Sequence, residues 1–164
     1  MWIVKDNIAM SCLPKNGSNS LHEVSPNKVV ENIEVLNIPV RVAWIREPYK
    51  RLISAYSFFK STIEGGGRLN KELSENVGSY EEFIDYTLNN NDEHWDSQVG
   101  QLTLNGDYLA TVSHRFEDIN ELWSLYFGGF IPHSNGCVHK TVSDYRKDEL
   151  DMKYKEDYEL WLGL

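Results

Sequence analysis

The strongest constraint on the fold is a repeated order of local patterns: a short apolar run, a turn that contains proline, and a segment with helical features. Residues 8–13 (I-A-M-S-C-L) form the first apolar run, which stops at Pro14 as a buried strand entering a turn does. Residues 39–45 form the second run, which is rich in β-forming residues and ends at Arg46-Glu47-Pro48. The order predicts strand, loop and helix, twice in succession.

The rest of the chain continues this alternation. Pro48 suits the first turn of a helix, and apolar residues then recur at three- and four-residue spacing to about residue 60. The later expected elements are a loop over 65–78, a helix over 80–88, a strand over 108–116, a helix capped by Asp118, and a helix over 147–162. Alternating strands and helices predict an α/β fold with a small, mostly parallel sheet flanked by helices, in which ligands bind beyond the carboxyl ends of the strands.

Length and composition are those of an ordinary globular chain. The 164 residues, 41% hydrophobic and 25% charged, predict a single domain over residues 1–164. No stretch approaches the ~18 apolar residues that span a bilayer, and the start lacks the features of a secretory signal. We therefore expect a soluble, cytoplasmic protein that does not enter a membrane.

Charge and cysteine content exclude further classes of site. A net charge of −9 argues against a nucleic-acid partner, because a phosphate backbone requires a cationic face. The histidines and the two cysteines, Cys12 and Cys137, have no spacing typical of metal ligands, so no metal is expected and both cysteines are expected to be free thiols. The sequence carries no indication of the oligomeric state.

The loop P-K-N-G-S-N-S at residues 14–20 has the composition of an anion site. Gly17 permits close approach of the backbone, Lys15 adds a charge, and Ser18 and Ser20 add hydroxyl donors at the start of a helix. The pattern is not a Walker A loop, because G-x-x-x-x-G-K-[ST] is absent and the lysine precedes the glycine. An ordinary turn and helix cap is the alternative interpretation.

The second segment, R-E-P-Y-K-R-L-I-S-A-Y at residues 46–56, is more specific. Arg46 at a strand end and Ser54 about two helical turns later can reach the same side, where a guanidinium and a hydroxyl would share a phosphate. The alternative is that Arg46 pairs with an acid and Ser54 faces solvent. Two candidate phosphate loops after two successive strands favour the binding interpretation.

With these two segments the chain resembles the sulfotransferases that use 3'-phosphoadenosine 5'-phosphosulfate (PAPS). Within them it resembles most the carbohydrate branch, which includes the chondroitin, dermatan and HNK-1 type enzymes and the heparan 2-O-sulfotransferases. P-K-N-G-S-N-S is similar to the family's 5'-phosphosulfate loop, and W-I-R-E-P-Y-K-R-L-I-S-A-Y is similar to its 3'-phosphate segment. Three later pieces agree: E-H-W-D-S-Q, R-F-E-D-I, and H-K-T-V-S-D-Y followed by Y-K-E-D-Y-E-L. The resemblance implies a P-loop-like nucleotide-binding sulfotransferase fold.

The resemblance also implies roles for individual residues. The 5'-phosphosulfate would be held by Lys15, Asn16, Gly17, Ser18, Asn19 and Ser20, and the 3'-phosphate by Arg46 and Ser54. Lys140 would close over the nucleotide, with Ser143 and Tyr145 as weaker candidates. Lys15 would also stabilise the charge that builds on the bridging oxygen as the phosphate leaves. Arg51 fits the motif, but it serves equally well as a structural residue, and both options stay open.

The acceptor hydroxyl needs a base, for which His94 in E-H-W-D-S-Q is the first candidate and His22 the second. The alternative for His94 is that it packs the loop onto the core together with Trp95. We expect a hydroxyl-bearing acceptor, a carbohydrate or a small molecule. Tyr56, Phe58 and Trp95 are aromatic residues that would serve either an acceptor cleft or the core.

The chain departs from the eukaryotic enzymes in being much shorter, and only about 25 residues separate its two candidate nucleotide segments. A glycosaminoglycan acceptor and a Golgi location are therefore not carried over. The expected activity is sulfuryl transfer from PAPS, with 3'-phosphoadenosine 5'-phosphate (PAP) as product and no metal. Two alternatives are a degenerate nucleotide-binding module of the same fold without turnover, and a nucleotide phosphotransferase of related fold.

Overall fold

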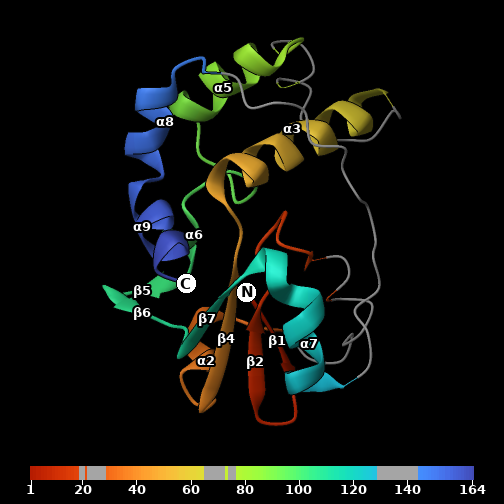
Figure 1. The fold of residues 1–164 in the computed structure, drawn as a ribbon, viewed down its shortest axis with the longest axis vertical. Coiled ribbons are helices and arrows are strands. Elements are labelled where there is room, and N and C mark those ends of the chain that lie inside the picture. The colour runs from red at the N-terminus through yellow and green to blue at the C-terminus, as the bar shows by residue number, and fades with distance from the viewer. Residues whose placement is uncertain (19–20, 22–28, 65–72, 74–76, 129–143) are drawn as a thin grey trace.

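The computed structural model describes residues 1–18, 21, 29–64, 73, 77–128 and 144–164. The fold contains a five-stranded sheet. The strands lie in the order β3-β1-β2-β4-β7 (Figure 1). Their bounds are Trp2–Lys5 (β1), Ile8–Ser11 (β2), Val29–Val30 (β3), Val40–Ile45 (β4) and Val112–Arg115 (β7). A separate two-stranded ribbon pairs β5 (Thr103–Leu104) with β6 (Asp107–Tyr108).

The centre of the sheet is parallel. Strand β4 pairs in parallel with β2, placing Val42 beside Met10, and with β7, placing Val42 beside Val112. Strand β1 pairs antiparallel with both β2 and β3, so the sheet is mixed. The α/β class with a largely parallel sheet is confirmed, whereas β1 was not among the expected elements.

The helices include those expected over residues 48–60 and 80–88 and after Asp118, together with a four-residue helix at 98–101 that was not expected. Their bounds are Asn32–Val35 (α2), Pro48–Glu64 (α3), Tyr80–Asn89 (α5), Gln98–Gln101 (α6), Ile119–Phe127 (α7), Lys147–Lys153 (α8) and Lys155–Gly163 (α9). The single helix expected over 147–162 is wrong, because the chain leaves helical geometry at Tyr154 and forms α8 and α9 instead. Asp118 stands at the N-cap of α7 as expected, although its side chain makes no capping hydrogen bond.

Three clusters of buried residues hold these elements together. On one face of the sheet α7 contributes Ile119 and Trp123, which pack with Trp44 of β4. On the other face Trp161 of α9 packs against a cluster that contains Ile45. A third cluster joins α3, α5 and α8 beyond the sheet.

Figure 1 shows how this arrangement places the candidate site. Strand β4 runs directly into α3, which crosses above the carboxyl end of the sheet, while α8 and α9 descend along one side. The expected loop over 65–78 lies largely outside the described residues. No helix in the described ranges combines the length and apolar character needed to cross a membrane.

Candidate functional site

The loop after β2 has a backbone shape that few residues tolerate. Lys15 has φ 67° and Gly17 has φ 75°, both in the left-handed region. A Cβ on Gly17 would lie 2.9 Å from Cε2 of Phe116, so the ring closes off the space beside the glycine. Leu21 N then donates to the Gly17 carbonyl at 3.0 Å, which begins a helical turn at Ser18. The expected order of strand, loop and helix start is therefore present here.

Arg46 joins this loop to the end of β4. Its Nη1 donates to the carbonyl oxygen of Lys15 at 2.6 Å, and its guanidinium carbon lies 5.2 Å from the centroid of the Phe116 ring. Phe116 thus lies against both Gly17 and Arg46. The two segments that the sequence identified as candidate phosphate sites meet in space, at the carboxyl ends of the parallel strands β2 and β4.

The side chains of Asn16 and Gln98 connect the loop after β2 to the end of β4 inside the protein. Asn16 is fully buried, and its Nδ2 donates to the Trp44 carbonyl and to Oε1 of Gln98, each at 2.7 Å. The Gln98 amide also bonds both backbone groups of Arg46: Oε1 accepts from Arg46 N at 3.0 Å and Nε2 donates to Arg46 O at 2.8 Å. The side chain of Asn16 is therefore occupied by protein contacts, and Asn16 Oδ1 is buried with no hydrogen bond among the described residues.

The alternatives for Arg51 are resolved by its contacts. Arg51 is 2% exposed, and it donates to the carbonyl oxygens of Pro14 at 3.2 Å, Asp96 at 2.6 Å and Glu93 at 2.7 Å. Burial lowers the pKa of its guanidinium, and the nearby charge of Asp157 acts in the opposite direction. Arg51 ties the loop after β2 to residues 93–96, which is a structural task.

Ser54 lies on α3, two turns beyond Arg46, and it is 6% exposed. Its place on the helix that follows β4 fits the expected pairing with Arg46, and a shared phosphate stays a prediction.

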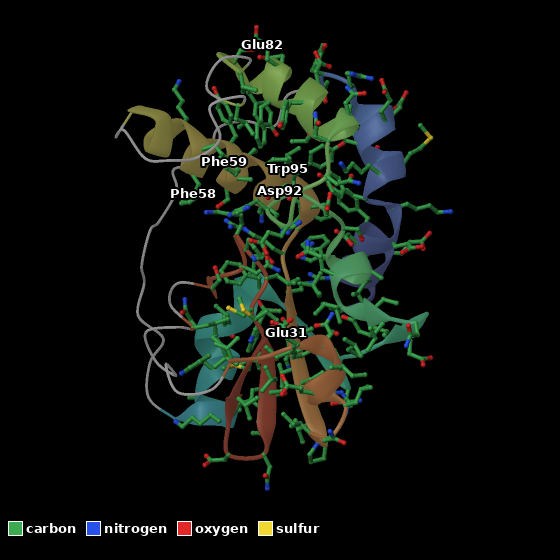
Figure 2. The ribbon with its side chains drawn as sticks, turned by 180° about the vertical axis from the view of Figure 1, so that it is seen from behind. Glu31, Phe58, Phe59, Glu82, Asp92 and Trp95 are labelled. Carbon is green, nitrogen blue, oxygen red and sulfur yellow. The ribbon has the colours of Figure 1, made fainter. Side chains whose placement is uncertain are left out.

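A phenyl ring on α3, that of Phe58, contacts both Lys15 and His94. Lys15 Nζ lies 3.9 Å from the centroid of the Phe58 ring, and the His94 ring stacks on the same residue at 5.6 Å with an interplanar angle of 13°. His94 Nδ1 lies 2.6 Å from Oδ1 of Asp92. Figure 2 shows Phe58, Phe59, Asp92 and Trp95 close together alongside α3.

The His94 and Asp92 pair has the geometry of an oriented base. In the neutral imidazole, Nδ1 donates to the carboxylate, which leaves Nε2 as the nitrogen that accepts a proton. The Asp92 carboxylate also accepts from the backbone N–H of His94 at 2.9 Å, so the pair is locally rigid. The Phe58 ring thus contacts a lysine of the loop after β2 and a histidine oriented by a carboxylate.

Comparison with known proteins identifies the family. The model of the sulfotransferase family matches residues 5–127, which contain the loop after β2, the segment from Arg46 to Ser54, and His94. The chain belongs to the sulfotransferase family. No curated protein matches the chain, and no solved structure does either.

Several residues predicted for this sulfotransferase have other surroundings or cannot be placed. Asn19, Ser20, His22, Lys140 and Ser143 lie outside the described residues. Tyr145 is described, and its hydroxyl donates to both carboxylate oxygens of Asp85 on α5, at 3.1 and 2.9 Å. A nucleotide contact for Tyr145 stays a prediction.

The three aromatic residues considered for an acceptor cleft of the sulfotransferase have different surroundings. Trp95 is 2% exposed and belongs to the cluster of α3, α5 and α8, so it is a core residue. Tyr56 is half-buried, and its ring lies 5.3 Å from that of Tyr80 and 5.5 Å from that of Phe83. Phe58 is the member of the set that contacts candidate catalytic residues.

Sequence reasoning passed over three residues that shape the site: Phe116, Gln98 and Asp92. Phe116 and Gln98 belong to R-F-E-D-I and E-H-W-D-S-Q, which were recognised as motifs without a role for these members. Asp92 stands two residues before His94, a spacing that allows a carboxylate to orient an imidazole, and this was the available signal.

Titration and metal binding add two constraints. Burial raises the pKa of the Cys12 thiol to about 11, so this cysteine at the end of β2 is not an activated nucleophile. In the ranges that the structure describes, no group of histidine, cysteine and carboxylate side chains is arranged to hold a metal ion.

Proposed function

We propose that this sulfotransferase moves the sulfuryl group of PAPS to a hydroxyl acceptor. The observation that carries the proposal is the contact between Arg46 Nη1 and the Lys15 carbonyl, which brings the two candidate phosphate segments together at the carboxyl ends of β2 and β4. In open α/β sheets, this edge is where ligands bind.

In this proposal, described residues would bind both the 5'-phosphosulfate and the 3'-phosphate of the nucleotide. The loop from Lys15 to Ser18 would take the 5'-phosphosulfate in the manner of a P-loop, because turns with left-handed residues, as at Lys15 and Gly17, commonly bind anions through backbone N–H groups. Arg46 and Ser54 would take the 3'-phosphate, since guanidinium and hydroxyl groups suit phosphate oxygens. A protein with a net charge of −9 must concentrate its cations where a polyanionic nucleotide binds.

The reaction is a single displacement at sulfur. The acceptor hydroxyl attacks the sulfur of PAPS and gives its proton to Nε2 of His94, while the bond from sulfur to the bridging oxygen of the 5'-phosphate breaks. The products are the sulfate ester, PAP and protonated His94. Lys15 stabilises the negative charge that grows on the bridging oxygen, an interaction stronger in the transition state than in the bound substrate.

The acceptor is proposed to be a carbohydrate or a small molecule that bears a hydroxyl group. Phe58, which contacts both Lys15 and His94, is the described aromatic residue best placed to touch it. Aromatic side chains commonly line ligand pockets, so an acceptor bound at the edge of this ring would have its hydroxyl near His94.

Calorimetric titration with PAP and with ADP tests the donor site, since the comparison isolates the 3'-phosphate. We expect micromolar binding of PAP, weak binding of ADP, and loss of this preference in Arg46→Ala. The matched control is Arg41→Ala, which removes a guanidinium at the opposite end of β4 that donates to the carbonyls of Ile38 and Leu109. This control should keep the preference for PAP.

Equal binding of PAP and ADP, or binding of neither, would overturn the PAPS assignment. A separate assay decides between an enzyme and a binding module without turnover. The protein is incubated with sulfur-labelled PAPS and a panel of sugars and phenols, and labelled sulfate esters are counted. PAP binding without any label transfer would support the degenerate module, and higher affinity for ATP than for PAP would support a phosphotransferase.

A further inference from the structure

One buried carboxylate in the last helix reaches the centre of the site. Asp157 of α9 is fully buried, and its Oδ1 accepts from Ser97 Oγ at 2.7 Å and from Val99 N at 2.9 Å. Its Oδ2 accepts from Gln98 N at 2.8 Å. Asp157 therefore binds the free N–H groups at the start of α6, the place where a carboxylate is most favourable.

The hydrogen bonds lead from this carboxylate to both nucleotide segments. Gln98 is held by Asp157 at its backbone N–H, and its side-chain amide bonds Asn16 on one side and the N–H and carbonyl of Arg46 on the other. The backbone partners settle the orientation of this amide, because Arg46 N must donate and Arg46 O must accept. Asp157 thus acts through one glutamine on the loop after β2 and on the end of β4.

A second buried charge, that of Arg51, also binds the backbone of residues 93–99. Arg51 binds the carbonyl oxygens of Glu93 and Asp96, whereas Asp157 binds the N–H groups of residues 98 and 99. The opposite charges of Arg51 and Asp157 attract each other across this segment. Removing either charged side chain would leave buried backbone groups without their hydrogen-bonding partners. We therefore expect a large structural change that is confined to this segment.

We propose that Asp157 is a positioning residue that sets the geometry of both nucleotide segments through Gln98. Helix α9 lies beyond residues 5–127, the part that matches the family model, so this role extends the site past the recognised family region. Only the measurement of PAP affinity depends on the proposed function; the measurement of amide exchange does not. Asp157 touches no reacting atom and is not a catalytic residue.

The test compares Asp157→Asn with the wild type and with Glu159→Gln, which makes the same chemical change at an exposed position of the same helix. The first readout is amide hydrogen exchange without ligand. We expect faster exchange at Arg46, Gln98 and Val99 in Asp157→Asn, with β1 and α5 unchanged, and the wild-type pattern in Glu159→Gln. Uniformly faster exchange along the whole chain would overturn the proposal, because it would mean only general destabilisation.

The second readout is PAP affinity. Losing a buried hydrogen-bonding partner of this kind is expected to raise the dissociation constant of PAP about tenfold in Asp157→Asn. Gln98→Met keeps the side-chain length and removes the amide, and it should cause a similar loss. Adding Asp157→Asn to Gln98→Met should then cost less than a further twofold, since both changes act on one path.

The outcomes separate the two proposals. Full PAP affinity in Asp157→Asn, or independent losses in the two variants, would overturn the positioning role while leaving the sulfotransferase assignment intact. If the wild type binds no PAP, the proposed function fails, and the local exchange pattern still decides the role of Asp157. If Asp157→Asn does not fold, the same exchange measurement on Asp157→Glu, which keeps the charge and changes the reach of the carboxylate, decides it.

Discussion

Arg46 Nη1 donates to the carbonyl oxygen of Lys15 at 2.6 Å, so the guanidinium proposed for one phosphate also fixes the loop proposed for the other. The contact leaves the Lys15 side chain directed to the Phe58 ring, 3.9 Å from its centroid. Backbone and side chain of Lys15 therefore have separate tasks: the carbonyl anchors the loop, and the ammonium group lies over the ring on which His94 stacks. This division makes the charge of Lys15 testable without dismantling the loop.

Lys15→Met is expected to abolish most turnover while keeping the apolar stem of the side chain. Electrostatic stabilisation of a leaving group by one preorganised cation is worth about 100-fold or more in kcat. PAP affinity should fall by much less, because the ammonium group acts mainly in the transition state. Single-turnover transfer from labelled PAPS measures the first effect and calorimetry the second.

The control is Lys60→Met, which removes an exposed ammonium group that also lies over an aromatic ring of α3, at 6.0 Å from the centroid of Tyr56. Its turnover should match the wild type. Equal turnover of Lys15→Met and Lys60→Met would contradict the role given to Lys15.

Arg51→Ala is expected to unfold the protein more easily without changing its choice of nucleotide. The substitution leaves three backbone carbonyl oxygens inside the protein without their donor, a loss of about 3 kcal/mol or more in the free energy of unfolding. Urea denaturation measures this loss. Arg51→Lys should recover part of it, because one ammonium group cannot reach three separated oxygens as a guanidinium does.

The preference for PAP over ADP distinguishes Arg51 from Arg46. The folded fraction of Arg51→Lys should retain that preference, whereas Arg46→Ala should lose it. A stable Arg51→Lys protein with no preference between PAP and ADP would place Arg51 in the nucleotide site instead.

The contrast between Arg46 and Arg51 shows how far sequence carried the site. Both arginines fit one motif, and their spacing could not tell that Arg46 binds the Lys15 carbonyl at the end of β4 while Arg51 is buried on α3 among backbone carbonyls. The two phosphate segments were found from local composition, because glycine, serine and lysine after a strand have a direct physical meaning. Gln98 and Asp157 were missed since their roles depend on contacts across 52 and 59 residues, which no local pattern encodes.

The fold shows the same limit. Strands β2 and β4 and helix α3 were predicted because hydrophobic periodicity and proline mark them within the chain. Strand β1 was missed since its four residues have meaning only through pairing with β2 and β3. The break at Tyr154 was missed as well, because its apolar spacing continues through both α8 and α9 while its hydroxyl donates to the distant Trp95 carbonyl.

His94→Ala is expected to lower kcat at least 100-fold with little change in PAP affinity, because a base acts on the acceptor and not on the nucleotide. Asp92→Asn should lower kcat less, since it removes the partner that orients the imidazole but leaves the imidazole itself. Single-turnover transfer from labelled PAPS measures both rates, and wild-type turnover in His94→Ala would exclude His94 as the base.

Gly17→Ala is expected to distort the loop and weaken PAP binding about tenfold or more. Two costs add here: a side chain at φ 75° costs about 1 kcal/mol, and its Cβ would lie 2.9 Å from the Phe116 ring. Gly106→Ala is the matched control, since Gly106 has φ 90° and open space around it. Calorimetry should show normal PAP affinity in Gly106→Ala and partial recovery in the double variant of Gly17→Ala and Phe116→Leu.

The Cys12 thiol is expected to resist alkylation until the protein unfolds. Its pKa is raised to about 11 by burial, so the reactive thiolate is about 100-fold scarcer near pH 8 than for a thiol of ordinary pKa. The unfolded chain loses this proton first, so it binds fewer protons between about pH 9 and 11, and the free energy of unfolding falls over that window. Iodoacetamide labelling of a Cys137→Ser variant, in buffer and in 8 M urea, measures the difference. Equal labelling rates in the two conditions would show that the Cys12 thiol is accessible in the folded protein. The burial of the end of β2, from which the loop at Lys15 begins, would then be contradicted.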